Sequence, residues 1–187
     1  MSFNGFPPEA LEFLAGLRKN NNRTWFNKHK ATYEACLIEP AREFVTAMGP
    51  KLARLSAEIL AVPKIAGGSI MRIHRDTRFS KDKTPYKEHL AFFFTHGEGK
   101  ARPGYYLHFN ADDLVLGAGT YCLGDALANY RDAVDRDATG KPLATTLAKL
   151  KKAGYGVGGT HYKRVPRGYD ADHPRAELLK HSGLYTH

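Results

Sequence analysis

The chain has 187 residues, 42% of them hydrophobic and 25% charged, which is typical of a soluble globular protein with a sizeable core. With 28 Lys and Arg residues against 19 Asp and Glu residues, the formal charge is +9, which favours contact with anions such as nucleic acid or phosphorylated metabolites. No apolar run approaches the ~18 residues of a membrane span, and the N-terminus lacks a signal-peptide pattern. The two cysteines form no zinc-binding pattern, and a reducing compartment is the simpler interpretation. We therefore expect a cytoplasmic protein with no membrane association, no metal and no cofactor.

Residues 1–61 are predicted to be helical. After Pro7-Pro8, apolar residues recur at positions 10, 13, 14 and 17, the spacing of one helix face. Asn20-Asn21-Asn22 then ends this helix and offers a cap for the next. Further on, we expect the helix to be interrupted or restarted at Pro40, and to bend or divide at Gly49-Pro50.

Residues 69–120 alternate in the manner of β-strands. Four closely spaced strands with short turns between them are predicted, at 71–74, 89–96, 105–109 and 114–119. Such a pattern is typical of an antiparallel meander.

Residues 121–187 predict helices and a basic C-terminal loop. The expected features are a helix at 124–136, a turn at 137–140, a helix from Pro142, a flexible glycine-rich loop at 154–159 and a short helix near Leu178. The chain as a whole predicts a single α+β domain over residues 1–187, with a β-meander of about four strands packed by N-terminal and C-terminal helices.

The most informative segment is Met71–Lys87, a dense basic run that turns at Thr84-Pro85 and leads into an apolar strand. Its cations are Arg72, Arg75, Arg78, Lys81, Lys83 and Lys87, with Asp76, Phe79, Asp82 and Tyr86 between them. Arg offers a planar donor fork to phosphate or carboxylate and Lys a point charge, so this segment predicts an anion site in which Asp76 orients Arg75 or Arg78. The alternative is a salt-bridge network that holds the loop, with Tyr86 packed beneath it.

A second basic cluster lies in residues 160–169. There Lys163, Arg164 and Arg167 alternate with Tyr162 and Tyr169. Aromatic rings beside cations can stack on bases while the charges follow a nucleic-acid backbone, or they can be ordinary packing beneath extended basic side chains. The prediction of an anion site would gain weight if this cluster folded beside the first.

Other motifs are weaker. Residues 154–159 match GxGxxG, but the strand before and helix after that a dinucleotide site requires are missing. His74, His89, His96 and His108 fall on or beside predicted strands without metal-ligand spacing, so we interpret them as structural or surface residues. Alternation places His74 and Asp76 on one strand face, which makes them the candidate acid–base pair.

The motif from Arg72 to Lys87 resembles the signature of an uncharacterised family, domain of unknown function 2461. The resemblance covers nearly the whole chain and extends to Asn21–Phe26, Gly104–His108, Gly117–Gly119, Lys163–Tyr169 and His173-Pro174. Tyr121-Cys122-Leu123 departs from the aromatic-x-Pro step expected there. The resemblance implies membership, but no activity, cofactor or catalytic residue.

Three hypotheses follow. The first is a module that binds phosphate-bearing ligands, with nucleic acid foremost, through the cations of both clusters and Tyr86. The second is an enzyme that clamps a small phosphorylated or carboxylate substrate with Arg75 and Arg78 and moves protons with Asp76 or His74. The third is a structural protein in which the basic loop is a salt-bridge lock.

Overall fold

The computed structural model describes residues 3–97 and 102–187. Contacts between residues divide the chain into two compact units, and of the described residues the first holds 3–97 and 106–116 and the second 102–105 and 117–187. The fold is α+β, as predicted, with six antiparallel strands in the order β1-β2-β3-β4-β6-β5. The prediction of a single domain stays a prediction.

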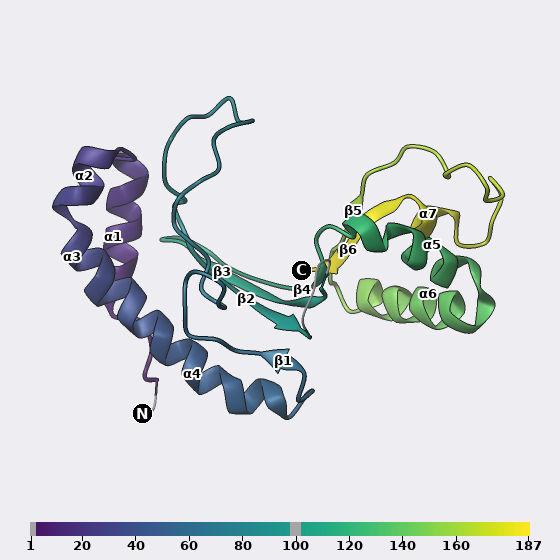
Figure 1. Cartoon of the computed structure of the whole chain (residues 1–187), viewed down its shortest axis with the longest axis horizontal. Helices are drawn as coiled ribbons and strands as arrows, with labels where there is room; N and C mark the ends of the chain where they lie inside the picture. The colour runs from purple at the N-terminus through teal and green to yellow at the C-terminus, as the bar shows by residue number, and fades with distance from the viewer. Residues whose placement is uncertain (1–2, 98–101) are drawn as a thin grey trace. The chain divides into compact units, whose positions relative to one another are not determined.

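The helical elements are α1 (Pro8–Lys19), α2 (Arg23–Lys28), α3 (Lys30–Tyr33), the π-helix η1 (Glu34–Ile38), α4 (Glu39–Ala53), the 3-10 helix η2 (Gly124–Ala126), α5 (Leu127–Asp135), α6 (Asp137–Lys152) and α7 (Ala176–Leu179) (Figure 1). The strands are β1 (Ile59–Leu60), β2 (Leu90–His96), β3 (Gly104–Phe109), β4 (Leu114–Thr120), β5 (Val157–Thr160) and β6 (His181–Thr186). None of the helices within the described ranges combines the length and the apolarity that crossing a bilayer requires.

The N-terminal helices follow the sequence pattern closely. In α1 the four apolar positions 10, 13, 14 and 17 are all buried. The Asn22 side chain caps α2 by accepting a hydrogen bond of 2.9 Å from the Trp25 N–H. The predicted interruption or restart at Pro40 does not occur: Pro40 lies in the first turn of α4, and because Ile38 before it keeps helical dihedral angles, the helix continues from α3 through η1 into α4.

The predicted division at Gly49-Pro50 is wrong, because α4 runs through Pro50 and ends at Ala53. Pro50 lies within the last turn of the helix, so its missing N–H removes only one bond before the helix ends. The irregularity lies upstream instead, in η1, where the Glu39 N–H bonds to the Glu34 carbonyl five residues back.

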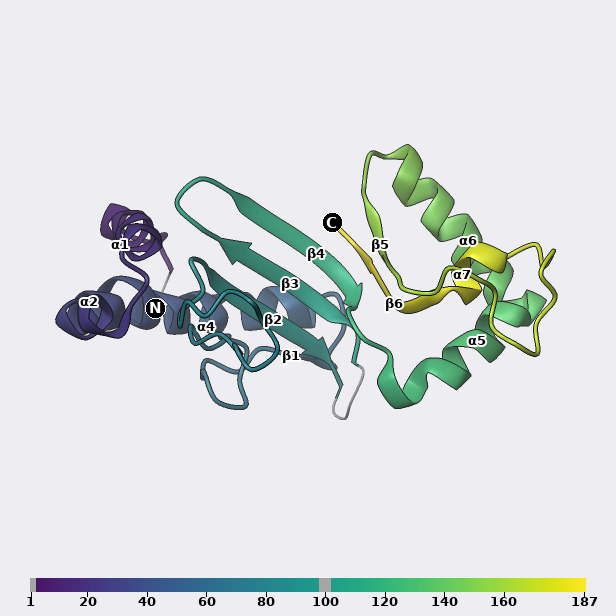
Figure 2. The same ribbon diagram turned by 90° about the horizontal axis from the view of Figure 1, so that it is seen from above.

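The core of the first unit lies between these helices and one face of the sheet. Phe92 of β2 is fully buried and lies 4.9 Å from Phe44 of α4, and Phe109 of β3 lies 4.6 Å from Phe6 (ring centroids). Figure 2 shows β2, β3 and β4 running side by side. Each fully buried ring of this kind stabilises the fold by roughly 1.5–3 kcal/mol.

The predicted strand at 71–74 is reduced to isolated pairings with the chain that leads into β2. Ile70 bridges Phe92, and His74 bridges Tyr86. The Lys87 N–H donates to the Ile73 carbonyl at 2.7 Å. Residues 76–84 form the loop between these paired arms.

In the second unit the sheet has strands that the sequence did not predict. The glycine-rich segment, expected to be a flexible loop, contains β5, which pairs with β6 from Val157↔Thr186 onward. The strands β1, β5 and β6 are additional to the prediction and the predicted strand at 71–74 is lost, so the sheet has six strands rather than about four. Short, glycine-rich or weakly alternating strands give little periodic signal, and their partners fix them instead.

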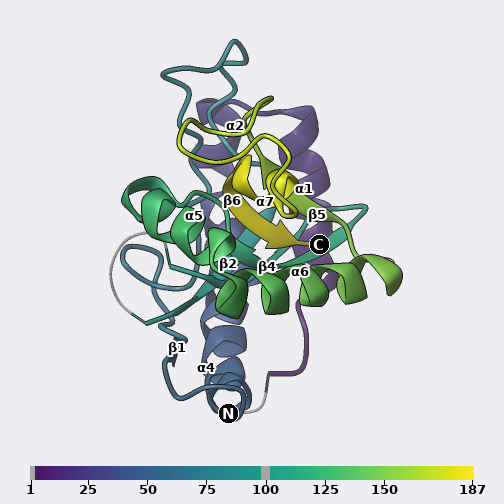
Figure 3. The same cartoon turned by 90° about the vertical axis from the view of Figure 1, so that its right-hand side faces the viewer.

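The expected turn at 137–140 is the first turn of α6, which begins at Asp137 rather than at Pro142. Gly140 permits this start, since a Cβ there would lie 2.0 Å from the Val134 carbonyl oxygen and 2.5 Å from Arg175 Nε. Figure 3 looks onto this unit, with the yellow-green segment between β5 and α7 on the side of α7 away from α6.

Candidate functional site

The basic loop of the first unit is closed at its base by Arg75. The guanidinium donates to the carboxylate of Asp82 and to the hydroxyl of Thr84. Asp82 in turn accepts the Thr84 N–H at 2.9 Å, and these bonds, that of Arg75 first, lower the pKa of Asp82 to about 2. Arg75 therefore fixes the loop, as the salt-bridge interpretation expects.

Nearer the loop's tip, Arg78 forms a two-pronged bond with Asp76. Its Nε and Nη2 lie 2.9 Å and 2.7 Å from the two carboxylate oxygens, which lowers the pKa of Asp76 to about 2. Lys83 donates to the Thr77 carbonyl at 2.9 Å. Three of the six predicted cations thus bond within the loop.

Between these bonds the loop presents Phe79 to solvent. The Phe79 side chain is 94% exposed, and the Arg78 guanidinium lies 5.6 Å from its ring centroid. Lys81, two residues on, is also exposed. In Figure 1 the loop stands out from the sheet of its unit. An exposed aromatic ring on a loop held by its own hydrogen bonds is a surface fit for stacking.

Asn21 ties the loop's second arm to the helices. Its side-chain amide donates to the Tyr86 carbonyl at 3.0 Å, and its oxygen accepts the Tyr86 N–H at 3.1 Å. The Tyr86 ring is buried and stacks on Phe26 at 4.2 Å. Tyr86 therefore packs beneath the loop, as the salt-bridge alternative expects, and its buried ring is not presented to a ligand.

The candidate acid–base residues have other partners. His74 packs 5.2 Å from the Tyr86 ring, and Asp76 is bonded to Arg78. Across residues 3–97 and 102–187, no hydrogen bond joins His74 to Asp76. With a pKa of about 2, Asp76 is a weak base at neutral pH.

A row of donor side chains leads from the loop's arms onto the sheet: Arg72, Lys87, His89 and His108. Burial lowers the pKa of Lys87, and the nearby Arg72 charge lowers it further. Within the described parts of the chain, neither Arg72 nor Lys87 forms an ion pair or side-chain hydrogen bond. Arg72 interacts electrostatically with the Asp76 carboxylate without a hydrogen bond, and two neighbouring cations that bond to no carboxylate favour the approach of an anion.

His89 and His108 continue this row, with ring centroids 4.6 Å apart. The Tyr106 hydroxyl is hydrogen-bonded to His108 Nδ1 at 2.9 Å. Burial lowers the pKa of both imidazoles, that of His89 to about 4, with smaller contributions from His108 and Lys87. Both rings are therefore neutral at pH 7 and able to take up a proton beside a bound anion.

From the sequence, His89 and His108 are interpreted as structural or surface residues without metal-ligand spacing, and no role beside an anion is predicted for them. The Tyr106-x-His108 alternation places both side chains on one strand face and was the available signal. His89 lies beside His108 because β2, which it precedes, is the neighbour of β3 in the sheet. The spacing of histidines in the sequence does not reveal this pairing. No group of three or more His, Cys, Asp or Glu residues suited to a metal occurs among the described residues.

The second basic cluster lies in the second unit, with Lys163, Arg164 and Arg167 all exposed. Its two tyrosines attach it to α5. The Arg131 guanidinium lies 5.0 Å from the Tyr162 ring centroid, and the Tyr169 hydroxyl donates to Asp132 at 3.1 Å.

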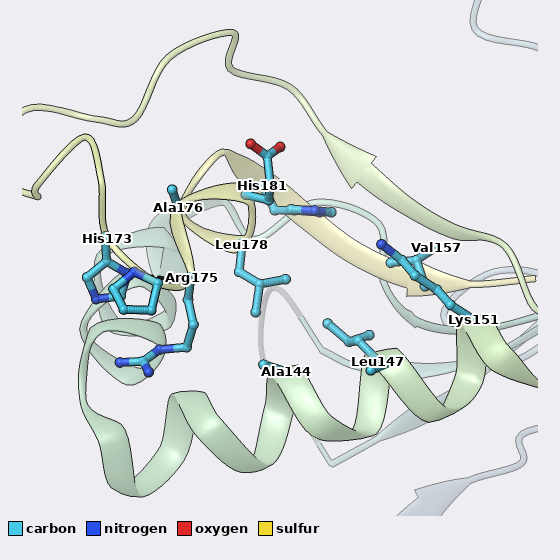
Figure 4. Close-up of a pocket in the computed structure, with 12 residues that line it drawn as sticks. Ala144, Leu147, Lys151, Val157, His173, Arg175, Ala176, Leu178 and His181 are labelled. Carbon is cyan, nitrogen blue, oxygen red and sulfur yellow. Dashed lines mark hydrogen bonds between the residues drawn. The ribbon is translucent and has the colours of Figure 1, made fainter.

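The second unit also contains a pocket of about 430 Å³ between α6 and the segment around α7 (Figure 4). Leu147 of α6 and Leu178 of α7 face one another across it. Of its polar lining, Arg175 donates to the Val134 and Asp135 carbonyls, both at 2.6 Å, and His181 contacts the Thr160 hydroxyl and the Gly183 carbonyl, both at 3.1 Å. These groups are satisfied by the chain itself, so they hold the fold rather than await a ligand.

A family model described as "Conserved hypothetical protein (DUF2461)" matches residues 9–187. Neither the curated proteins nor the solved structures include a match.

Proposed function

Given that the chain belongs to the DUF2461 family, whose description assigns no activity, we propose from the first unit's geometry that the protein binds phosphate-bearing ligands, with nucleic acid foremost. The observation that carries the proposal is Phe79, 94% exposed on a basic loop that is held in place by its own hydrogen bonds. Removing a phenylalanine from water normally stabilises a protein, so its full exposure here suits contact with a partner.

A base stacked on Phe79 would lie beside Arg78, whose charge already faces the ring. Stacking of this kind contributes about 1–3 kcal/mol per base and tolerates any sequence. The loop is held before the ligand arrives, which lowers the entropy cost of binding. Arg75 in this proposal supports the loop and does not contact the ligand.

The phosphates would be met by the cations of the basic loop and its arms that form no hydrogen bond or ion pair among the described residues. Arg72, Lys81 and Lys87 have no side-chain hydrogen bond or ion pair in the described residues. Cations that neutralise phosphates release counterions, so the affinity should fall steeply as salt rises.

Fluorescence anisotropy with labelled single-stranded and double-stranded DNA and RNA, across a salt series, tests the proposal. We expect Phe79→Ala to weaken binding of single strands about 5- to 150-fold, the loss of one stacked base. The control is Tyr155→Ala, which removes an exposed ring of the second unit.

The salt series supplies an independent check. Lys81→Ala and Lys87→Ala should each weaken binding equally for all sequences and reduce the salt slope by about one. Absence of binding at low salt, or an affinity that does not depend on salt, would refute the nucleic-acid proposal.

The second candidate is an enzyme acting on a small anionic substrate, favoured by the His89–His108 pair beside Lys87. Arg72 and Lys87 would hold the anion and a histidine would transfer the proton, in place of Asp76 and His74. With para-nitrophenyl phosphate as substrate, His108→Ala should abolish turnover, Lys87→Ala should raise KM, and His96→Ala should change neither. Turnover that survives loss of both His89 and His108 would exclude this role.

A further inference from the structure

Arg131, on α5, has one edge of its guanidinium buried without an acceptor. Its Nε and Nη2 atoms are out of contact with solvent, and no hydrogen-bond partner for either lies in the described part of the chain. A buried charged donor without a partner is strongly unfavourable, and native structures rarely contain one unless a ligand or water fills the place.

The edge of the Arg131 guanidinium that lacks an acceptor is formed by Nε and Nη2, which can together donate to two neighbouring oxygens. Arg78 uses its Nε and Nη2 to hold both oxygens of Asp76, and Arg175 uses the same two atoms to hold the Val134 and Asp135 carbonyls. The same two atoms of Arg131 meet no acceptor within residues 3–97 and 102–187. This edge fits a planar pair of oxygens, which carboxylates and phosphates supply.

The face of the same guanidinium is already occupied. Tyr162 stacks on it with the Arg131 Cζ atom 5.0 Å from the ring centroid. Stacking on the face leaves the edge free for in-plane hydrogen bonds, so the tyrosine fixes the fork's orientation without competing for its acceptor.

Tyr162 begins a strap, residues 162–173, that is fastened along α5 (Figure 3). The Tyr169 hydroxyl donates to Asp132 at 3.1 Å, and His173 Nε2 lies 3.2 Å from the Asp135 carboxylate. The strap carries Lys163, Arg164 and Arg167, all exposed. A dianion would be drawn to this segment more strongly than a monoanion.

We propose that Arg131 and the strap form a binding site for a terminal phosphate, that of a small phosphomonoester or of inorganic phosphate, with the fork of Arg131 as its bidentate receptor. Because Nε and Nη2 are out of contact with solvent and Tyr162 of the strap lies on the guanidinium, the phosphate must be small, and its entry requires the strap to move. A nucleic-acid backbone, whose phosphates are flanked by sugars on both sides, does not fit beneath it. The site lies within the second unit and does not depend on the function proposed for the first.

The test uses the full chain and inorganic phosphate, with sodium chloride at matched ionic strength as reference. Phosphate should raise the Tm of the wild type, because a ligand that binds only the folded state stabilises it. In Arg131→Met this rise should disappear, and phosphate affinity by titration calorimetry should fall about 10- to 100-fold, the loss of a charged hydrogen-bonding pair. Without phosphate, the Tm of Arg131→Met should equal or exceed that of the wild type, since the variant removes an unpaired buried charge.

Proton–nitrogen NMR of the arginine Nε–H groups gives a direct readout, because phosphate should shift the Arg131 signal in particular. Arg136→Met, an exposed arginine just after the same helix, is the matched control and should keep the phosphate response. Because the shift is read at the Arg131 signal itself, it reports on this site and not on the first unit.

Three results would overturn the proposal: a wild-type Tm that phosphate leaves unchanged, an equal rise in Arg131→Met, or an equal rise with acetate. Arg131→Met that is destabilised with and without phosphate, alongside a wild type that does not respond, would mean that Arg131 serves only to pack against Tyr162.

Discussion

Arg75 and Lys87 are both positively charged and lie in one short segment. Their roles differ because their neighbours in the structure differ. The Arg75 guanidinium is bonded to Asp82 and Thr84, so its charge is already compensated within the protein. The Lys87 ammonium is half-buried near Arg72, and its pKa is lowered. A bonded cation adds order, whereas an unbonded one raises the local potential and is available to a ligand. Composition does not make this distinction, because it depends on which carboxylate the fold brings close.

The role of Arg75 as a loop clamp can be checked by acid titration. A lowered carboxyl pKa stabilises the folded loop above the unfolded value of 3.8, and this contribution is lost as pH falls through about 2. In Arg75→Gln the pKa of Asp82 should rise towards its ordinary range, so the loop should lose order at a higher pH than in the wild type. Carboxyl NMR signals followed into the acid range measure both quantities.

Arg42→Gln is the control, since it breaks a surface pair with Glu39 far from the loop in sequence. An Asp82 pKa that is the same in the wild type and Arg75→Gln would contradict the clamp.

The Asn21 side chain forms hydrogen bonds with the backbone of Tyr86, as a neighbouring β-strand would. Its amide satisfies both the N–H and the carbonyl of Tyr86, a buried residue. Asn21→Ala would leave both groups without a partner, and we expect it to lower the free energy of unfolding by about 2–4 kcal/mol. Urea denaturation measures this loss. Asn20→Ala removes only an exposed bond to the Gly16 carbonyl and should cost less than about 1 kcal/mol.

At the scale of whole elements, two glycines inside helices should respond oppositely to the same substitution. Gly140→Ala would press a Cβ against the Val134 carbonyl and Arg175 Nε, which hold the start of α6. We expect a loss of about 1–3 kcal/mol or more. Gly49→Ala in α4 meets only Ala61 at 3.7 Å and should stabilise the fold by about 0.5–1 kcal/mol. Thermal denaturation measures the stability of both variants. If both were stabilised or both destabilised, the result would count against the packing described for Gly140.

The elements that the sequence predicts are those whose signal is local. The stripe in α1 and the run in β2 each contain their own periodicity, and Asn22 caps the helix that follows it. The start of α6 depends instead on a carbonyl and a guanidinium from outside the helix, so the sequence pointed to Pro142. Likewise β5 is a strand because β6 pairs with it, although its glycines favour a loop.

In the candidate site, too, the features with a local sequence signal could be predicted, and those that depend on the fold could not. The sequence left open whether Tyr86 binds a ligand or packs beneath the basic loop, and the structure has the ring stacked on Phe26 beneath the loop. The residues of the Arg75–Asp82 and Arg78–Asp76 pairs are fewer than ten positions apart in sequence. The sequence offers several cations for two carboxylates, however, and only the folded loop determines which cation bonds to which carboxylate. The His89–His108 contact and the unfilled fork of Arg131 depend on three-dimensional neighbours and had no sequence signal of comparable strength.

At the scale of the whole chain, the first unit is not a continuous stretch of sequence. Residues 3–97 provide its helices and β2, but 106–116 supply Phe109, which closes the core 4.6 Å from Phe6. A fragment that ends at residue 97 lacks this ring and also leaves β2 without its neighbour β3. An uncovered apolar strand edge favours aggregation.

We therefore expect the fragment 1–97 not to fold cooperatively, whereas 1–116 should. Losing a buried phenylalanine costs about 3–5 kcal/mol, a large part of the 5–15 kcal/mol that typically stabilises a domain, and the loss of β3 adds to it. Far-UV circular dichroism with thermal melting of both fragments measures the difference, and Phe109→Ala in the full chain isolates the ring's share. A cooperative melt of 1–97 would show that the helices and β2 suffice, and that the hairpin of β3 and β4 is an addition to the core rather than a part of it.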